Sequence, residues 1–249
     1  MKIIKIINSD PILNKYKKLK KYDDNLIILE SEKVILYAQK MGFEFEEIVS
    51  HDEFYFRNKK LKSKNYFSLE KNDLSSFIGY KSHSGVFATI KVPSVELKLS
   101  NRVIILDKLT SPENVGSICR SASAFGFKTV IYHSNGVSPY LRRCIRVSTG
   151  HILGLNIIKS ECLLKTVDEL KKDKFNIICG HNSSRSIYLE TNKNNFKNLA
   201  LIIGSEGHGI SQELINRADY EIKISTHDDV EHLNASNAAS ILMHHFRAI

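Results

Sequence analysis

The spacing of hydrophobic residues becomes regular after about residue 100. Short runs of Ile, Val and Leu alternate there with segments that have helical spacing of apolar residues. Near-continuous apolar runs are typical of strands buried on both faces of a parallel sheet, and their alternation with helices indicates βα units. The pattern therefore predicts a doubly wound α/β domain. Its expected strands are Val103–Leu106, Thr129–Tyr132, Leu155–Ile158, Phe175–Cys179, Leu199–Ile203 and Tyr220–Ile224.

Capping signals mark the helices between these strands. Ser111-Pro112 predicts a helix that runs to Phe125 and stops at Gly126, and Ser138-Pro139 predicts the start of the next one. The other expected helices are Glu161–Lys172, Ser211–Arg217 and a final helix from Asn234 to the end of the chain.

The first part of the chain has shorter and less regular elements. We expect strands at Met1–Ile7, Leu26–Glu30, Phe45–Val49 and Val86–Ile90, with broken polar structure between His51 and Ser76. A helix should begin after Asn8-Ser9-Asp10-Pro11 and run from Ile12 to Lys21, and a second should run from Ser31 to Met41 and end at Gly42. The chain therefore divides into two predicted domains. They are a small α/β domain, residues 1–95, and the doubly wound domain, residues 100–249, joined around Pro93 to Ser100.

The composition is that of an ordinary globular protein, 42% hydrophobic and 25% charged over 249 residues. No apolar run approaches the ~18 residues that a membrane-spanning helix needs. The stretch Met1–Ile7 contains lysines, so we interpret it as a strand rather than a signal peptide. The four cysteines form no C-x-x-C pair, which argues against a metal site or a disulfide framework. Both observations favour a cytoplasmic protein without a structural metal.

The net charge of +9 favours a nucleic-acid partner, although the abundance of lysine in this chain weakens the argument. The arginines are more informative, because a guanidinium fork is chosen where phosphate or carboxylate must be held in a fixed geometry. Residues 1–99 contain only Arg57, and residues 100–249 hold the other eight arginines. Arg142 and Arg146 are four residues apart on a predicted helix. They form either a solvated basic face or a surface that positions phosphate.

A glycine-rich turn, Gly204–Gly209, follows the buried strand Leu199–Ile203 and precedes a helix. Such turns expose backbone N–H groups to ligands. No lysine follows as in nucleotide-triphosphate loops, and the G-x-G-x-x-G pattern of dinucleotide sites is absent. Glu206 in the middle of the turn would repel phosphate and attract a cation. S-adenosylmethionine (AdoMet) is a cationic ligand with an adenine and no phosphate, and it suits such a turn.

Two further stretches accompany this turn. In Asn114–Arg120, Gly116 and Arg120 lie four apart on one helix face, where a glycine favours close approach of another group. Leu233–Ala239 is rich in small residues. Each stretch by itself is equally well explained by helix packing with a surface arginine or by tight core contacts.

Taken together, the three stretches resemble the three motifs of the SpoU family of RNA 2′-O-ribose methyltransferases, within the SPOUT superfamily. Asn114 to Arg120 resembles the first motif, Ile203 to Gly209 the second, and Ile222–Ile224 followed by His232 to Ala239 the third. The resemblance covers residues 101–249. The first ninety or so residues are similar, less sharply, to the family's substrate-binding domain, at Leu29-Glu30 and at Gly79 to Gly85.

The resemblance implies a deep trefoil knot, an exception to the usual unknotted topology, and a homodimer whose partner completes an AdoMet site. It implies that Arg120 lies by the target ribose, where it serves or assists the base on the 2′-hydroxyl and holds phosphate. Asn114, Glu206 and Asn234 would position the reacting groups. If the helix face of Arg142 and Arg146 positions phosphate, these two residues are the candidates to bind RNA with Arg120. The residues it places at the cofactor are Ile203, Gly204, Glu206, Gly209, Ile224, Leu233, Asn234 and Ala238.

Two positions depart from the family pattern. His232 stands where the family has serine, and Lys223 where it has proline. His232 is a candidate proton acceptor, a tolerated substitution, or a sign of altered activity. The leading hypothesis is an AdoMet-dependent methyltransferase acting on rRNA or tRNA. The alternatives are a knotted RNA-binding protein that has lost catalysis, and a small-molecule enzyme of the doubly wound class.

Overall fold

The computed structural model describes residues 3–14, 25–58, 60–70, 73–74, 85–95, 98–192, 195–227 and 233–247. The chain divides into two compact units. Unit 1 comprises Met1–Ser94 together with Tyr140–Leu153, and unit 2 comprises Val95–Pro139 together with Gly154–Ile249. The first division lies at the expected linker. The assignment of Tyr140–Leu153 to unit 1 differs from the single continuous second domain that the sequence predicted.

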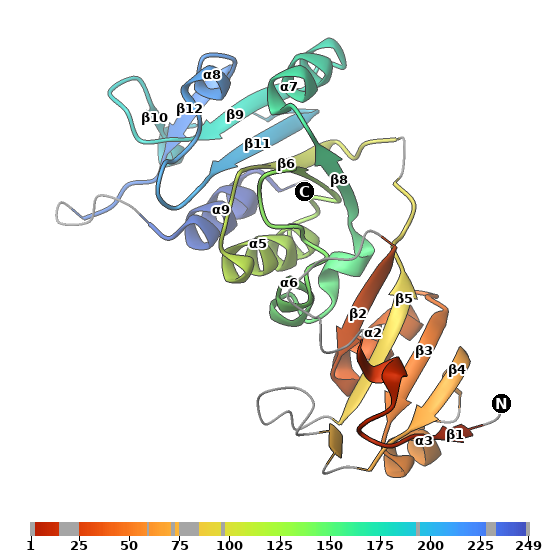
Figure 1. Ribbon diagram of the computed structural model, residues 1–249. Coiled ribbons are helices and arrows are strands. Elements are labelled where there is room, and N and C mark those ends of the chain that lie inside the picture. The colour runs from red at the N-terminus through yellow and green to blue at the C-terminus, as the bar shows by residue number, and fades with distance from the viewer. Residues whose placement is uncertain are drawn as a thin grey trace. The chain divides into compact units, whose positions relative to one another are not determined.

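Unit 1 is built on a five-stranded mixed sheet in the order β1-β4-β3-β5-β2 (Figure 1). Strands β1, β4 and β3 run parallel to one another, and β5 pairs antiparallel with both β3 and β2. The strands are β1 (Ile3–Lys5), β2 (Leu26–Glu30), β3 (Phe45–Ser50), β4 (Ser63–Ser68) and β5 (Val86–Lys91), and the helices in this part of the chain are η1 (Pro11–Leu13), α2 (Glu32–Lys40) and α3 (Asp52–Arg57).

Helix α2 shows why the local sequence signals worked in this unit. The Ser31 hydroxyl accepts a hydrogen bond from the Val34 N–H at the start of the helix. At its end Gly42 has a φ of +84°, and the Phe43 N–H bonds back to the Ala38 carbonyl. These contacts satisfy backbone groups that a helix terminus leaves unpaired.

Two segments predicted in unit 1 lie partly or wholly outside the described residues. Asp10 caps η1 as its sequence suggests, but most of the helix expected as far as Lys21 lies outside the described residues. The loop from Gly79 to Ser84, one of the points of family resemblance, also lies outside them. The broken stretch after His51 contains α3 and β4.

The helix expected to begin at Ser138-Pro139 begins instead at Arg142, so that prediction was wrong. Helix α6 (Arg142–Val147) has Leu141 as its N-cap, with extended backbone angles, and η2 (His151–Gly154) follows. Just before it, the Val137 N–H donates to the Leu109 carbonyl at 2.8 Å, and the Tyr140 side chain is buried. These tertiary contacts keep the chain out of the helical conformation that the local capping signal favours.

Unit 2 contains a seven-stranded sheet in the order β10-β12-β9-β11-β6-β7-β8, and every pairing in it is parallel. The α/β class and the parallel sheet predicted from the apolar runs are thus confirmed. Only the two-residue edge strand β10 was not expected. The strands are β6 (Arg102–Asp107), β7 (Thr129–His133), β8 (Asn156–Ser160), β9 (Asn176–Gly180), β10 (Ile187–Tyr188), β11 (Leu199–Gly204) and β12 (Tyr220–Lys223).

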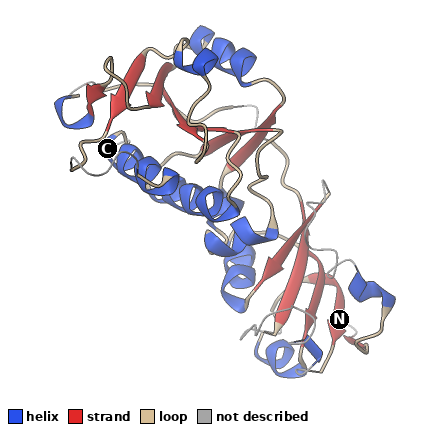
Figure 2. Cartoon of the chain, turned by 60° about the vertical axis from the view of Figure 1, so that its left-hand side comes forward, coloured by secondary structure: helices blue, strands red, loops and turns tan. Residues whose placement is uncertain are grey.

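Helices lie on both faces of this sheet (Figures 1 and 2). On one face, α7 (Leu163–Lys172) and α8 (Gln212–Ile215) pack on the strands through a continuous apolar core. On the other, α5 (Pro112–Ala124) packs against α9 (Ala235–His245), and α9 contacts β9 and β11. Among the described residues, no helix is both long and apolar enough to cross a membrane.

Helix α9 is held at its C-terminal end and in its middle. Its C-cap carbonyl, that of Phe246, accepts a 2.7 Å hydrogen bond from Nε of Arg102, a buried arginine at the start of β6. The same guanidinium donates to the Lys197 carbonyl at 3.0 Å. In its middle, α9 is joined to α5 by a 2.8 Å bond between the Ser240 and Ser121 hydroxyls. These contacts fix where the N-terminus of α9 lies.

Candidate functional site

The glycine turn after β11 has a backbone geometry that only glycine allows. Ser205 and Gly209 exchange two backbone hydrogen bonds of 3.0 and 2.9 Å, which close the turn into a small loop. A Cβ on Gly204 would overlap backbone atoms of Gly209 and Ile210. Gly209 has a φ of +67°, in the left-handed region that side chains disfavour. The two glycines are therefore required for the shape of the turn.

A buried carboxylate anchors the far end of the turn. Asp107, at the end of β6, accepts a 2.8 Å hydrogen bond from the Ser211 backbone N–H, just before α8. Because β6 and β11 are neighbours in the sheet, this bond holds the chain leaving the turn against the strand beside it. The turn is thus fixed at both of its ends.

A chain of side-chain hydrogen bonds joins the three stretches singled out in the sequence. Asn114 on α5 donates from Nδ2 to Oε1 of Glu206 at 2.5 Å. Its Oδ1 accepts a 3.1 Å bond from Nδ2 of Asn234. Asn234 in turn caps α9, since its Oδ1 accepts from the Ser236 N–H at 2.9 Å. One buried amide, Asn114, therefore links the turn to the start of the last helix.

A cavity of about 400 Å³ opens beside this chain of bonds, at the carboxyl ends of the strands. Its walls are largely apolar side chains from β11, β12 and α9, together with the glycine turn. All the residues expected to contact the cofactor line it except Asn234, which lies next to Asn114. Those lining residues are Ile203, Gly204, Glu206, Gly209, Ile224, Leu233 and Ala238.

Several polar residues of the same cavity were not predicted from the sequence to contact a ligand, although Lys223 was noted as a departure from the family pattern. His181 and Asn182 follow β9, Lys223 ends β12, and Thr226 comes shortly after it. Lys223 is steadied by Tyr188, with its Nζ 4.3 Å from the centre of the aromatic ring. The signal that could have found His181 is its place just after the predicted buried strand Phe175–Cys179, in the same relation to its strand as the glycine turn has to Leu199–Ile203.

The other side of the turn borders a second cavity, of about 490 Å³. It is lined by Asp107, Lys108, Thr110, Asn135 and Ser211, and it shares Ser205 and Gly207–Gly209 with the first cavity. His208, interpreted from the sequence as an exposed loop residue, is exposed and borders both. The turn thus forms a thin wall between two cavities.

The arginines expected at RNA lie in different surroundings. Arg120 is exposed on α5 and lies outside the lining of both cavities. Arg142 forms an ion pair with the buried carboxylate of Glu30, its guanidinium lies 5.4 Å from the Phe87 ring centre, and its side chain is only 13% exposed. Arg146 lies 3.7 Å from the same carboxylate. On this helix, therefore, Arg142 pairs with an internal carboxylate and does not form part of an open basic face.

Metal and thiol chemistry have no visible centre in the described part of the chain. No group of three His, Cys, Asp or Glu side chains gathers there as a metal site would require. The four cysteines are all free thiols. Burial raises the pKa of Cys179 to about 12, so it remains protonated. His232, the candidate proton acceptor, lies outside the described residues.

Fold and cavity together have the form of an α/β domain that takes a ligand at the carboxyl edge of a parallel sheet. The chain belongs to the SpoU rRNA methylase family, whose pattern matches residues 101–244. The matched region includes all three motif stretches.

Related sequences agree with this assignment. Proteins named as TrmH-family tRNA/rRNA methyltransferases from Staphylococcus epidermidis and Staphylococcus aureus are each 37% identical to the chain over 142 residues. The aligned part is 57% of this chain and 56% of each relative. The chain thus spans about half the length of the curated relatives it matches.

Solved structures share the fold over nearly the whole chain. An rRNA methyltransferase from Sinorhizobium meliloti superimposes with a TM-score of 0.85 at 16% identity, covering 98% of this chain and 97% of that one. AviRb from Streptomyces viridochromogenes, a SpoU methyltransferase solved with the cofactor AdoMet, gives 0.78 at 17% identity, covering 95% and 97%. A solved RNA 2′-O ribose methyltransferase gives a TM-score of 0.79 at 20% identity, covering 98% of this chain and 97% of that one. At such identities the likeness concerns the fold.

Proposed function

We propose that this protein transfers a methyl group from AdoMet to a ribose 2′-hydroxyl of rRNA or tRNA. The observation that carries the proposal is the bond chain from Glu206 through Asn114 to Asn234, beside a cavity that the glycine turn closes. Family membership and the names of the relatives support RNA methylation. The solved RNA 2′-O ribose methyltransferase supports the ribose as acceptor.

The cavity suits AdoMet in size and chemistry. Its volume of about 400 Å³ falls within the range of roughly 300–1,000 Å³ typical of small-molecule sites. Ile222, Leu233 and Leu242 offer apolar surface to an adenine ring, and Gly204 lets the backbone approach closely. Glu206 supplies a carboxylate for the cationic part of the molecule. AdoMet has been solved in the S. meliloti enzyme and in AviRb, two proteins of this fold. When bound, AdoMet supplies an electrophilic methyl group.

The protein's own residues would align the reaction and handle charge. We assign to Asn114 and Asn234 the task of holding Glu206, the turn and α9 in one arrangement, because alignment lowers the barrier of a simple transfer. Arg120 would bind the phosphate next to the target ribose and assist loss of the 2′-hydroxyl proton. The 2′-hydroxyl makes the acceptor RNA rather than DNA.

Assembly belongs to the same proposal. Arg120 lies outside its own chain's cavity linings, so in the homodimer we propose it would complete the site of the other copy. We also propose that the C-terminal part of unit 2 forms the deep knot of the SPOUT superfamily, and that residues 1–95 select the RNA. The free cysteines suit the reducing cytoplasm, where rRNA and tRNA are found.

The test is transfer of a tritiated methyl group from AdoMet to bulk rRNA and tRNA, followed by mass spectrometry of the digested nucleosides. The proposal expects label in 2′-O-methyl nucleosides. Label in methylated bases would overturn the ribose assignment. Tight RNA binding without any transfer would favour a binding protein that has lost catalysis. Activity on small molecules that needs no AdoMet, together with a lack of RNA affinity, would favour a small-molecule enzyme of the doubly wound class.

A further inference from the structure

The loop after β9 is more tightly built than a surface loop requires. The Ser186 hydroxyl accepts a 3.0 Å bond from the Ser183 N–H and donates a 2.8 Å bond to the His181 carbonyl. The His181 N–H continues the sheet by donating to the Ile222 carbonyl at 3.0 Å. Both backbone groups of His181 are therefore fixed, and its position at the cavity is set.

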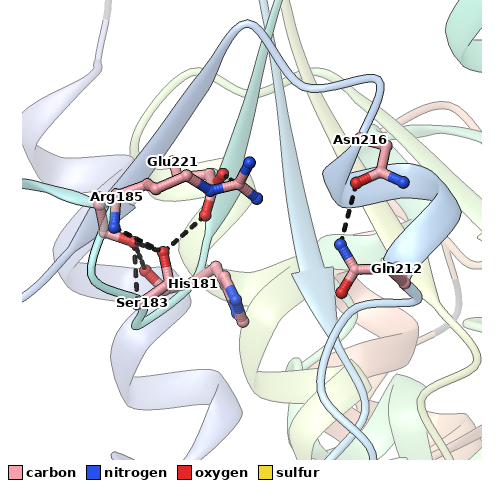
Figure 3. Close-up of polar contacts among 7 residues, drawn as sticks. His181, Ser183, Arg185, Gln212, Asn216 and Glu221 are labelled. Carbon is pink, nitrogen blue, oxygen red and sulfur yellow. Dashed lines mark hydrogen bonds and ion pairs between the residues drawn. The ribbon is translucent and has the colours of Figure 1, made fainter.

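A carboxylate on the neighbouring strand clamps the same loop. Glu221 on β12 accepts a 2.8 Å bond from the Ser183 hydroxyl and pairs with Arg185 at 3.2 Å. The Glu221 side chain is only 13% exposed. Figure 3 shows these three side chains grouped together, with the His181 imidazole directed away from them. The loop is held by its other residues, which leaves the imidazole available to the cavity that it lines.

Lys223 is a second residue with N–H donors among those that line this side of the cavity. It follows Ile222, the residue whose carbonyl binds the His181 N–H, so the two donors stand at the ends of adjacent strands. Its ammonium lies over the Tyr188 ring, which attracts the cation without accepting its three N–H donors in the manner of a carboxylate.

Hydrogen-bond acceptors and donors lie on different sides of the cavity. The strand order β12-β9-β11 puts Lys223 and the glycine turn on opposite sides of His181. With strands about 4.8 Å apart, the ends of β12 and β11 are separated by roughly 10 Å. Glu206, an acceptor, rises from the turn on one side, and the donors of His181 and Lys223 lie on the other. A ligand with a cationic and an anionic group would be oriented by this division.

We propose that His181 and Lys223 bind the carboxylate of the methionine part of AdoMet, and that Glu206 faces its cationic groups. This proposal rests on the proposed function and deepens it. The carboxylate is the one anionic group of AdoMet, and hydrogen bonds to an ionised acceptor are about twice as strong as neutral ones. The pair therefore determines which way the cofactor enters and favours ligands that keep the amino-acid end.

Two ligands that differ in this end provide the test. S-adenosylhomocysteine carries the carboxylate, and 5′-methylthioadenosine lacks the whole amino-acid end. Calorimetric titration should show that His181→Ala and Lys223→Met each weaken S-adenosylhomocysteine binding about tenfold or more. The same variants should change the affinity for methylthioadenosine by less than about twofold. Lys128→Met, at an exposed lysine of unit 2, is the matched control and should change neither affinity.

A conservative variant separates recognition from packing. His181→Gln keeps an N–H donor and should retain more S-adenosylhomocysteine affinity than His181→Ala. Equal weakening of both ligands by the alanine and methionine variants would show that the residues only shape the wall, and would overturn the proposal. So would unchanged binding of both ligands. If the wild-type protein bound neither ligand, the proposed function itself would fail. That result differs from binding that the substitutions of His181 and Lys223 leave unchanged.

Discussion

Removing the amide of Asn114 should uncouple the turn from the last helix. Asn114→Ala deletes the 2.5 Å bond to Glu206 and the 3.1 Å bond from Asn234 with one small change. We expect methyl transfer to fall at least about a hundredfold, the scale on which misplaced reacting groups cost rate. Asn114→Asp should do at least as much harm, because it places a second carboxylate against Glu206.

The effect on stability should be much smaller than the effect on rate. A bond to a charged group contributes about 1.5–3 kcal/mol and a neutral one about 0.5–1.5 kcal/mol. Asn114 is buried, but Glu206 and Asn234 are exposed, so water can replace the lost partner at both of them. The free energy of unfolding should therefore fall by only about 2 kcal/mol, at the lower end of the summed range.

The assay pairs urea unfolding with methyl transfer. The chain has no tryptophan, so unfolding is followed by circular dichroism. Asn216→Ala is the control, because it removes a 2.9 Å bond between the exposed side chains of Gln212 and Asn216, neither of which lines a cavity (Figure 3). The reasoning is refuted if Asn114→Ala transfers methyl groups at the wild-type rate, or if Asn216→Ala loses as much.

Four further outcomes are expected. Gly204→Ala should abolish S-adenosylhomocysteine binding in calorimetry, because its Cβ overlaps the backbone that closes the turn. Arg120→Ala should lower methyl transfer about a hundredfold or more while cofactor affinity stays unchanged, and equal activity would remove Arg120 from the mechanism. Burial raises the pKa of Tyr66 to about 12, so the folded protein keeps a proton that the unfolded chain loses above pH ~10. Stability should fall by about 2–3 kcal/mol between pH ~10 and ~12 in urea titrations, and Tyr66→Phe should lack that loss. Glu30→Gln should cost about 3 kcal/mol in the same assay by leaving the half-buried cation of Arg142 without its counter-ion, and an unchanged midpoint would contradict this.

Patterns set by local physics were readable in the sequence. The strands of unit 2 are buried on both faces, so their apolar runs are nearly unbroken, and the predicted strands appear where those runs lie. The cap of α5 by Ser111 and the end of α2 at Gly42 follow from backbone groups within a few residues. The resemblance of three stretches to the SpoU motifs also predicted that these stretches would meet, and the bonds of Asn114 join them.

Contacts between distant segments were not readable in the same way. The i,i+4 spacing of Arg142 and Arg146 indicated either a solvated basic face or a surface that positions phosphate, yet Arg142 pairs with the buried carboxylate of Glu30 on β2 and Arg146 lies close to it. The Ser138-Pro139 capping signal was overridden by burial of Tyr140 and by a backbone bond to Leu109. In each case a tertiary partner decided the outcome.

His181 and the second cavity belong to this group as well. The place of His181 after a buried strand was a signal in the sequence, but which cavity it lines became visible only once β9 was seen between β11 and β12. The second cavity depends on Lys108 and Asn135, which follow two neighbouring strands and meet only across the folded sheet. No periodicity in a single sequence indicates which distant segments contact each other in the fold.

The bond from Arg102 to the Phe246 carbonyl sets an order of events during folding. It connects the first strand of unit 2 to its last helix, so almost the whole unit must be synthesised before it can form. Leu233, Ala238 and Leu242 supply one wall of the cavity, and that wall does not exist until this helix docks. Contacts so far apart in sequence are slow to form because a long loop must close first. This wall of the cavity therefore forms only after α9 has been synthesised and has docked on the sheet.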